Sequence, residues 1–337
     1  MTTISFSSTL RGKFIRRLQR LWWSQRSRFR RARIISHLRR RVAQGHRFKA
    51  YPDVCLSLQA FNKDFLLRRS LQPFLAGGLR HMLVFADACC DRTVTRAHRL
   101  LPGRDHLVIV ANDRHEVANN QLALLLAQQR GCHFLLVLQD DDLYPPGLDW
   151  LDYGLDLFEA DPRLLVLGFN VGLDFRSFEP ATDSYLHTPL RDRPDVAPEA
   201  VGIDGAFLAI RHGLPPHPAK LQHRYCQIVC RAPLLIRVQP FIQQGGFDQR
   251  FAPFQDDDTH FCLRSWSLGY RCALVRGLPV RRDMGIGGMR LMGHIGVRRA
   301  PHTLRNIRLV HEEFGAAIND GSLQALVEAA NRSAGLR

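Results

Sequence analysis

Two clusters of consecutive carboxylates are the residues of this chain best suited to chemistry. Each is an aspartate triplet preceded by glutamine: residues 139–142 end an apolar run, and residues 255–258 follow a Gly-Gly-Phe-Asp turn. Adjacent carboxylates repel one another, so a folded protein tolerates them where water, hydrogen-bond donors or a cation offset their charge. We therefore expect a hard metal ion at one cluster and proton transfer at the other.

The elements that must position these clusters follow from the alternation of short apolar runs with helical patterns. Strands are expected at 54–58, 81–85, 106–110, 134–138, 164–169, 205–210, 225–230 and 272–275, and helices at 63–75, 92–101, 117–127, 145–160, 259–268, 304–318 and 323–330. This alternation is typical of an α/β fold with a parallel sheet. The first triplet directly follows the strand at 134–138, where ligands bind in open α/β sheets. Residues 171–200 are polar and proline-rich, which predicts a surface loop or lid.

The positive charge of the chain lies almost entirely in its first fifty residues. Residues 1–50 contain fifteen Lys or Arg and no Asp or Glu; since the whole chain has a formal charge of +16, residues 51–337 carry only +1. An acid-free basic arm is typical of a segment that contacts a polyanion, and the Trp22-Trp23 pair suits a membrane interface. We expect a peripheral anchor at an anionic membrane surface. A solvated or disordered tail and nucleic-acid binding are the alternatives.

The remaining composition indicates a cytoplasmic protein. There is no apolar run of about 18 residues that could span a bilayer, and the N-terminus lacks the apolar core of a signal peptide. An organellar transit peptide, which is also Arg-rich and acid-poor, stays open as an alternative. The eight cysteines include no pair of CxxC motifs, so we expect reduced thiols packed in a core rather than disulfides or a zinc site.

Four segments give the chain a resemblance to a known family. In order they are SLQAFNKDFLLRRSL from residue 57, LVFADACCDRT from residue 83, ANNQLALLLAQQRGCHFLLVLQDDDLYPPGLD from residue 118, and GGFDQRFAPFQDDDTHFCLRSWSLGY from residue 245. Together they resemble the family 2 nucleotide-sugar glycosyltransferases, which have the GT-A fold. The resemblance covers roughly residues 52–276. It implies a Rossmann-like three-layer α/β sandwich with a mostly parallel central sheet, preceded by the basic arm at 1–50 and followed by a loop and helical extension at 277–337.

The resemblance assigns a metal site to the first triplet. Relatives often have Asp-x-Asp-Asp at this strand, and in register with the following Pro-Pro pair Gln139 replaces the first aspartate. Asp141 then matches the principal metal-binding residue, with Asp142 as a second ligand and Asp140 beside the bound donor. The implied cofactor is Mn²⁺ or Mg²⁺, held together with the donor diphosphate.

The resemblance also places the nucleotide. Asp87 matches a family aspartate that hydrogen-bonds the base or ribose, and Asn62 lies in the nucleotide-facing turn after the first strand. Asn120 belongs to a pair that is often Arg-Asn in relatives and lies near the diphosphate. Here Asn119 replaces that arginine, so the sequence offers fewer cationic side chains to bind the phosphates.

The second triplet is the expected source of the catalytic base. Counting back from the Cys-Leu-Arg run at 262–264 places the family's Glu-Asp pair at Asp257 and Asp258. Asp258 is then the base that removes the proton of the acceptor hydroxyl, and Asp257 orients or binds the acceptor. The alternative is that the triplet only caps the helix expected from residue 259.

These observations favour a metal-dependent inverting glycosyltransferase of the hexosyltransferase type. It would move sugar from a nucleoside-diphosphate-sugar to a hydroxyl of a glycan or lipid-linked acceptor, in cell-envelope polysaccharide biosynthesis at the cytoplasmic face of the membrane. Two alternatives stay open. Gln139, the missing arginine and the lack of a clear metal-binding histidine favour a weak or inactive GT-A-like subunit, and the basic arm is compatible with a metal-dependent nucleic-acid protein.

Overall fold

The computed structural model describes residues 51–101, 105–178, 200–203, 207–212, 221–230, 232–278, 280–282 and 299–336. The predicted basic arm at 1–50 lies outside these residues. The chain separates into two units, residues 1–49 and residues 50–337, and the fold is that of the second unit.

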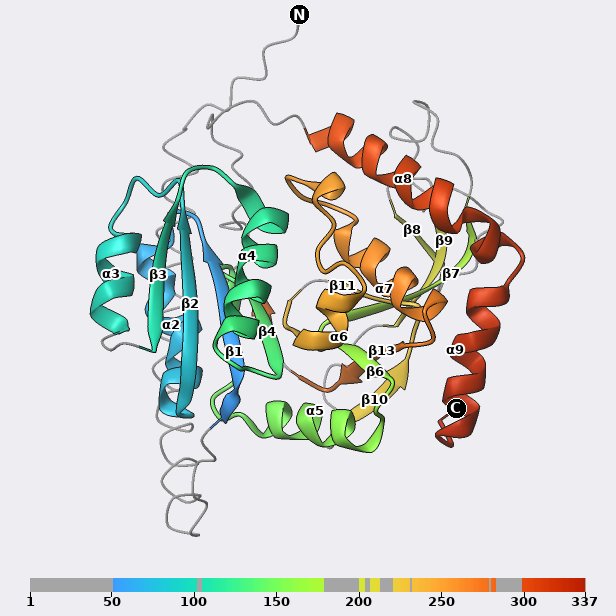
Figure 1. Cartoon of the computed structure of the whole chain (residues 1–337), viewed down its shortest axis with the longest axis horizontal. Helices are drawn as coiled ribbons and strands as arrows, with labels where there is room; N and C mark the ends of the chain where they lie inside the picture. The colour runs from blue at the N-terminus through green and yellow to red at the C-terminus, as the bar shows by residue number, and fades with distance from the viewer. Residues whose placement is uncertain are drawn as a thin grey trace, which may run out of the picture. The chain divides into compact units, whose positions relative to one another are not determined.

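A sheet of eight strands forms the centre of this unit (Figure 1). In spatial order the strands are β10 (Gln222–Tyr225), β13 (Arg271–Arg276), β6 (Leu164–Gly168), β12 (Leu234–Arg237), β4 (Phe134–Gln139), β1 (Tyr51–Ala60), β2 (Leu79–Asp87) and β3 (His106–Ala111). Strands β3, β2, β1 and β4 are mutually parallel, as are β6 and β13. Only β12 and β10 run antiparallel to their neighbours. The parallel strands thus end at one common edge of the sheet.

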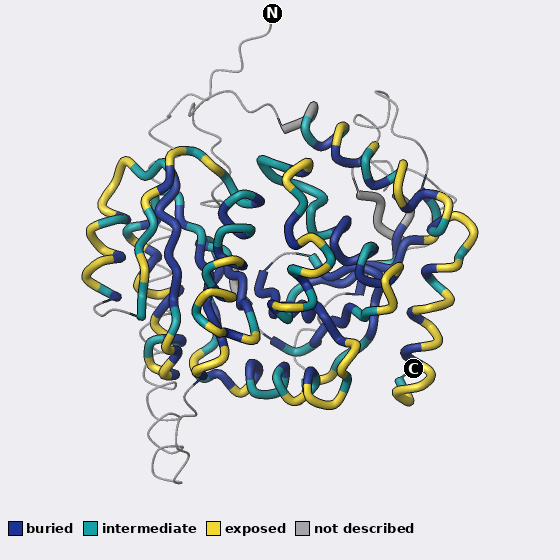
Figure 2. The backbone as a smooth tube through the Cα atoms, viewed as in Figure 1, coloured by how far each residue is buried: buried dark blue, intermediate teal, exposed yellow. Residues whose placement is uncertain are grey.

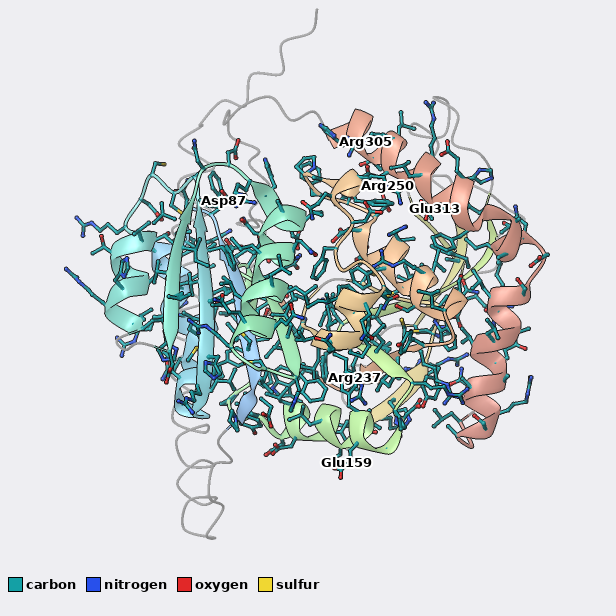
Figure 3. The ribbon with its side chains drawn as sticks, in the orientation of Figure 1. Asp87, Glu159, Arg237, Arg250, Arg305 and Glu313 are labelled. Carbon is teal, nitrogen blue, oxygen red and sulfur yellow. The ribbon has the colours of Figure 1, made fainter. Side chains whose placement is uncertain are left out.

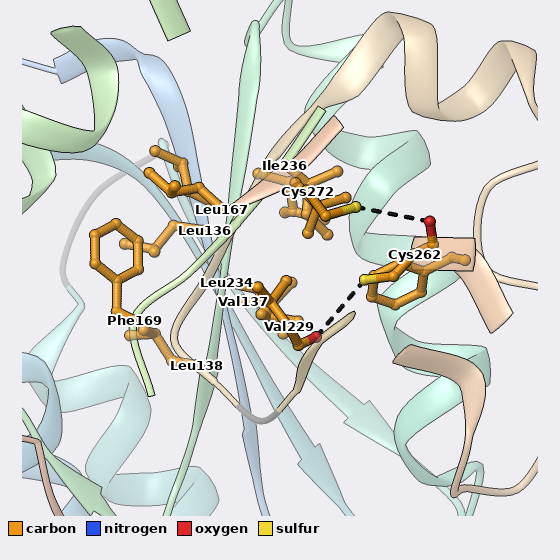
Figure 4. Close-up of a cluster of buried hydrophobic side chains, with 14 of the residues drawn as sticks. Leu136, Val137, Leu138, Leu167, Phe169, Val229, Leu234, Ile236, Cys262 and Cys272 are labelled. Atoms are coloured by element: carbon orange, nitrogen blue, oxygen red, sulfur yellow. Dashed lines mark hydrogen bonds between the residues drawn. The ribbon is translucent and has the colours of Figure 1, made fainter. Parts of the chain in front are cut away.

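The strands are buried because their sequences are apolar on both faces. Figure 2 shows the central strands buried and the outer helix surfaces exposed. The middle of the sheet contributes the cluster of Figure 4, in which the β4 side chains pack with those of β6 and β12. In the same cluster the thiols of Cys262 and Cys272 donate to the carbonyls of Val229 and Cys262, each at 3.7 Å. The eight cysteines are free thiols.

Helices cover both sides of the sheet. They are α2 (Asp64–Ala76), α3 (Thr93–Leu100), α4 (His115–Gln129), α5 (Asp149–Ala160), α6 (Val238–Gln243), α7 (Asp257–Ser267), α8 (Arg299–Asn319) and α9 (Ser322–Ser333), with a short 3₁₀ helix at Gln249–Phe251. Phe74 of α2 packs edge-on against Trp150 of α5, with ring centroids 6.1 Å apart. On the face toward the viewer in Figure 1, Phe241 of α6 packs against Phe261 of α7, and α4 contacts α6. The predicted α/β class, with a mostly parallel central sheet between helical layers, is confirmed.

A second, antiparallel sheet was only partly predicted. Its strands are β11 (Ile228–Cys230), β7 (Val171–Phe178), β9 (Phe207–His212) and β8 (Ala200–Ile203), and a further pair joins β5 (Asp142–Leu143) to β14 (Arg281–Arg282). Strand β7 occupies the start of the region predicted to be a loop or lid. The strand expected at 225–230 is in fact two strands in different sheets.

Buried polar contacts explain both differences. Asp174 makes β7 look polar, but it is buried, and its carboxylate lies 2.7 Å from His212 Nε2. At the break between β10 and β11, the backbone N–H of Gln227 donates to Asp174 Oδ1 at 2.8 Å, and the Gln227 side chain accepts from Phe175 N at 2.9 Å. These contacts satisfy backbone groups that a continuous strand would have paired.

Asparagine side chains join the two C-terminal helices to both sheets. Asn319, at the end of α8, accepts from Phe178 N at 2.7 Å and donates to Phe178 O at 2.9 Å. Asn331 of α9 makes the same pair of contacts with Tyr225, each at 3.0 Å. The helices predicted at 304–318 and 323–330 are therefore packed onto the sheets.

The Gln227 junction leads to a test of stability. Gln227→Leu keeps the approximate volume but leaves buried backbone groups of β7 unpaired, so we expect the free energy of unfolding to fall by about 2–4 kcal/mol. Denaturant titration measures the change. The matched control is Gln128→Leu: Gln128 is exposed and bonds Gln239 at 3.0 Å, so its loss should cost less than about 0.5 kcal/mol. Equal effects of the two substitutions would contradict the assignment.

Candidate active site

The first triplet follows β4 at the edge where β1 and β2 also end. The backbone N–H of Phe61, in the turn after β1, donates to Asp140 Oδ2 at 2.7 Å, and Lys63 Nζ lies 3.4 Å from Asp140 Oδ1. The Lys63 side chain is only 2% exposed. Burial raises the pKa of Asp140 to about 6, against the opposing charge of Lys63. Asp140 thus ties the ends of β1 and β4 together, and its predicted contact with a donor stays a prediction.

The other two aspartates of this triplet differ in accessibility. Asp142 begins β5 and is fully buried, with both carboxylate oxygens shielded from solvent. Asp141 is partly exposed, and its carboxylate has no hydrogen bond or ion pair with another described residue. Asp141 is therefore the member of the triplet that a ligand can reach in this conformation.

The implied metal can be tested against these side chains. Within the described ranges, no group of three His, Cys, Asp or Glu residues is arranged to hold a metal ion. Asp140 is already paired with a lysine. Asp141 fits the role of a single carboxylate toward an ion that arrives with its diphosphate, as Mg²⁺ commonly does.

The predicted nucleotide residues hold the loops at the ends of β1 and β2. Asp87, which is 3% exposed and labelled in Figure 3, accepts from Arg114 N at 3.0 Å and from His115 N at 2.7 Å, at the start of α4. Asn62 has a left-handed backbone with φ of 53°, and its Oδ1 accepts from Cys90 N at 2.8 Å. A carboxylate or amide oxygen can accept more than one hydrogen bond, so these contacts leave capacity for a nucleotide.

A layer of side-chain amides lies beneath the carboxylates. Gln59 and Gln139 are register partners on β1 and β4. Gln59 Nε2 donates to Asn120 Oδ1 at 2.8 Å and to Glu116 O at 2.9 Å, and Gln139 Nε2 donates to Glu116 Oε1 at 3.4 Å. Asn120 is buried, so it supports α4 in the conformation described. Its predicted place near a diphosphate stays a prediction.

Glu116, in the first turn of α4, is the residue that sequence reasoning missed. Burial is the largest cause that raises its pKa to about 7, and the charges of Asp258, Asp140 and Asp141 also raise it. The Glu116 carboxylate is therefore close enough to residues of both triplets to interact with their charges, so the two triplets lie in a common region. A glutamate in the first turn of a helix is already explained by the helix dipole, so no separate signal marked it.

The second triplet begins helix α7. The helix starts at Asp257, two residues earlier than predicted, so both Asp257 and Asp258 lie in its first turn. Asp258 Oδ1 accepts from Thr259 N at 2.9 Å. Burial raises the pKa of Asp257 well above its ordinary value, with further contributions from Asp258 and Glu116. Burial and like charge therefore outweigh the helix dipole, which alone would lower this pKa.

Comparison with known proteins finds similar solved structures, of which TarS from S. aureus is one. No family model matches the chain, and no curated protein matches it. The crystal structure of TarS from S. aureus is 12% identical, with a TM-score of 0.41; the match covers 66% of this chain and 35% of TarS, so this chain spans about a third of that protein's length. At this identity and TM-score the likeness carries no argument about activity.

The position of Glu116 leads to a pH-dependent prediction. Its pKa is raised from 4.5 to about 7 in the folded protein, so folding is penalised as the pH rises through this interval, and the penalty is complete above pH 7. Glu116→Gln removes the charge, so we expect the variant to gain about 1–3 kcal/mol over the wild type above pH 7, and no gain below pH 4.5.

Unfolding curves at several pH values measure this gain. Glu159→Gln is the matched control, because Glu159 (labelled in Figure 3) is exposed on α5 and is not among the charges that raise the pKa of Glu116. A gain of the same size for both variants, or one independent of pH, would show that Glu116 is not in a charged cluster.

Proposed function

We propose that the protein is an inverting glycosyltransferase that takes its sugar from a nucleoside-diphosphate-sugar bound with a divalent metal. The observation that carries the proposal is the position of the first triplet at the edge where parallel strands of the sheet end, with Glu116 Oε1 3.4 Å from Gln139 Nε2 and the pKa of Glu116 raised by charges of both triplets. One triplet has an accessible carboxylate for the donor, and the other has carboxylates for the acceptor.

On the donor side, Asp141 would ligate the metal that neutralises the leaving diphosphate. Asp87 and Asn62, at the ends of β2 and β1, would contact the nucleoside. Asp140 and the buried Lys63 hold the turn between them, since Phe61 N and Lys63 Nζ both contact the Asp140 carboxylate. These residues bind and orient the donor, and Mn²⁺ or Mg²⁺ would supply charge stabilisation when bound.

On the acceptor side, Asp258 would take the proton of the acceptor hydroxyl as its oxygen attacks the anomeric carbon. Attack opposite the leaving diphosphate inverts the configuration at that carbon. Burial and the charges of Asp258 and Glu116 raise the pKa of Asp257 above its ordinary value, so it is a weaker acid than a free aspartate. We assign it to orienting the acceptor, beside the residue that removes the proton.

A screen of nucleoside-diphosphate-sugars, with and without divalent metal, tests the function through release of nucleoside diphosphate. Asp258→Asn should lower kcat by about 10²–10⁴-fold, because the base is lost while its shape is kept. The donor KM should change little. Asp149→Asn is the control, since Asp149 is an exposed aspartate in the first turn of α5. Full activity of the Asp258 variant would reject the assignment of the base.

The main alternative is a GT-A-like subunit without turnover. It is favoured by Gln139 in place of an acid and by the lack of a three-residue metal cluster among the residues described. Isothermal titration with UDP and Mn²⁺ separates the two. We expect metal-dependent UDP binding by the wild type and at least about tenfold weaker binding by Asp141→Ala, which loses the proposed ligand. Absence of metal-linked binding in the wild type would favour the inactive subunit.

Attachment to a membrane is a separate part of the proposal. None of the described helices has the length and apolar composition needed to cross a bilayer. The fifteen basic residues of 1–50 and the Trp22-Trp23 pair would instead bind an anionic membrane face, where glycan or lipid-linked acceptors are found. In flotation with anionic liposomes, the full chain should float and a chain lacking residues 1–48 should not. Equal recovery of both in the soluble fraction would reject the anchor.

The same deletion tests the nucleic-acid alternative. That alternative predicts a salt-sensitive affinity for DNA or RNA that is lost when residues 1–48 are removed.

A further inference from the structure

The segment that leads into the second triplet has an unusual backbone. Gln255 and Asp256, directly before α7, have φ angles of 77° and 59°. Two consecutive non-glycine residues in the left-handed region cost of order 1–3 kcal/mol each, and they persist where the surroundings impose them. The orientation of α7's first turn, with Asp257 and Asp258, therefore depends on what holds this segment.

Asn306 of α8 holds it from one side. This asparagine is fully buried, and its Nδ2 lies 3.1 Å from Phe251 O, 2.9 Å from Phe254 O and 2.8 Å from Gln255 O. One amide group thus faces three carbonyls of the segment, including the carbonyl of the first left-handed residue.

Arg305 fixes which way this amide points. Its guanidinium donates to Asn306 Oδ1 from Nε at 3.0 Å and from a terminal nitrogen at 2.9 Å. A guanidinium has only donors, so the amide oxygen must face it and the NH₂ must face the carbonyls. The same guanidinium donates to Ala252 O at 2.5 Å, which adds a fourth carbonyl of this segment to the contact with α8.

Helix α8 also contacts residues on both sides of the triplet: His260 of α7, which follows it, and Arg250 of the 3₁₀ helix, which precedes it. Glu313 lies 2.9 Å from His260 Nε2 and 2.7 Å from the Arg250 guanidinium. Figure 3 shows Arg250, Arg305 and Glu313 together where this segment meets α8. The ring of Phe254 packs against His302 of α8, with centroids 6.1 Å apart. Contacts from one helix thus bracket the triplet at both ends.

We infer that α8 positions the second acidic triplet, with Asn306 as the central positioning residue. The side chain touches no reacting atom; it fixes the backbone that aims Asp257 and Asp258. The consequence for catalysis rests on the proposed function, whereas the consequence for the conformation of residues 252–258 does not. The C-terminal helices then form part of the site, although none of their side chains is among its predicted acids.

Asn331 serves as the control for Asn306, because it is a buried asparagine whose contacts do not involve the second triplet. It is also buried, lies in the C-terminal helices and pairs with backbone groups, but its partner is Tyr225 of β10. Asn306→Asp and Asn331→Asp are both isosteric and both replace a donor that faces a carbonyl. The two substitutions should therefore lower the melting temperature alike, and only the first should disturb the triplet.

The experiment compares these two variants in the full chain. Hydrogen exchange should accelerate about tenfold or more at residues 252–258 in Asn306→Asp, because hydrogen bonds to the segment are lost, and should stay unchanged there in Asn331→Asp. With an active donor, kcat should fall about 10²-fold only in Asn306→Asp, the effect expected when a catalytic group is misplaced by about 1 Å. The donor KM should stay within about twofold, since the first triplet is untouched.

A milder pair of variants covers the case in which Asn306→Asp does not fold. Arg305→Met releases the amide from its fixed orientation, and Arg308→Met is its control, since both arginines are exposed on α8. The Arg305 variant should show the same changes at smaller size.

The outcomes separate the two proposals. Equal exchange at residues 252–258 in the wild type and in both Asn306 and Arg305 variants would overturn the inference. Faster exchange with unchanged kcat would overturn its catalytic part. A wild type that releases nucleoside diphosphate from no donor would reject the proposed function, and the exchange data would still decide whether α8 positions the triplet.

Discussion

Repulsion among carboxylates is the constraint on which the rest of this structure depends. Charges of both triplets raise the pKa of Glu116, and Asp258 and Glu116 raise that of Asp257, so the fold must offset several negative charges at one edge of its sheet. It does so in two ways: a buried lysine pairs with Asp140, and backbone N–H groups donate to Asp140 and Asp258. Burial and like charge also raise the pKa of Asp257. Such an arrangement costs stability, which is typical of sites where charge is used rather than merely tolerated.

Polar side chains that bond to backbone groups give this edge its shape. Asp87 fixes the turn before α4, Gln59 joins β1 to α4, and Asn306 fixes the segment before α7. Each contact satisfies buried donors or acceptors that regular secondary structure leaves unpaired. The elements that carry the acids are thus joined by specific hydrogen bonds, in addition to the apolar core beneath them.

Local patterns predicted most of the central sheet because its strands are apolar along their whole length. The run at 134–138 became β4 with only Gln139 added. The same reasoning failed where burial and polarity coincide. The polar Asp174 led to the prediction of a loop where β7 lies, and the run at 225–230 is divided between two sheets at Gln227. Both side chains accept hydrogen bonds from backbone N–H groups that are distant in sequence, which a local pattern does not contain.

The candidate site shows the same division between what is local and what is not. The triplets could be found from composition and position, but their proximity is known only from Glu116, whose pKa is raised by the charges of Asp258, Asp140 and Asp141. The role of Asn306 depends on contacts with residues more than 50 positions away, which no local pattern contains.

The burial of Lys63 has a practical consequence. It is the one lysine in the described part of the chain, and its side chain is 2% exposed. An amine-directed reagent can modify its ammonium only after the turn beyond β1 has opened. Lys63 is therefore a natural chemical reporter: its rate of acylation, located by peptide mass, would measure how often the turn after β1 opens and how much a bound ligand slows that opening.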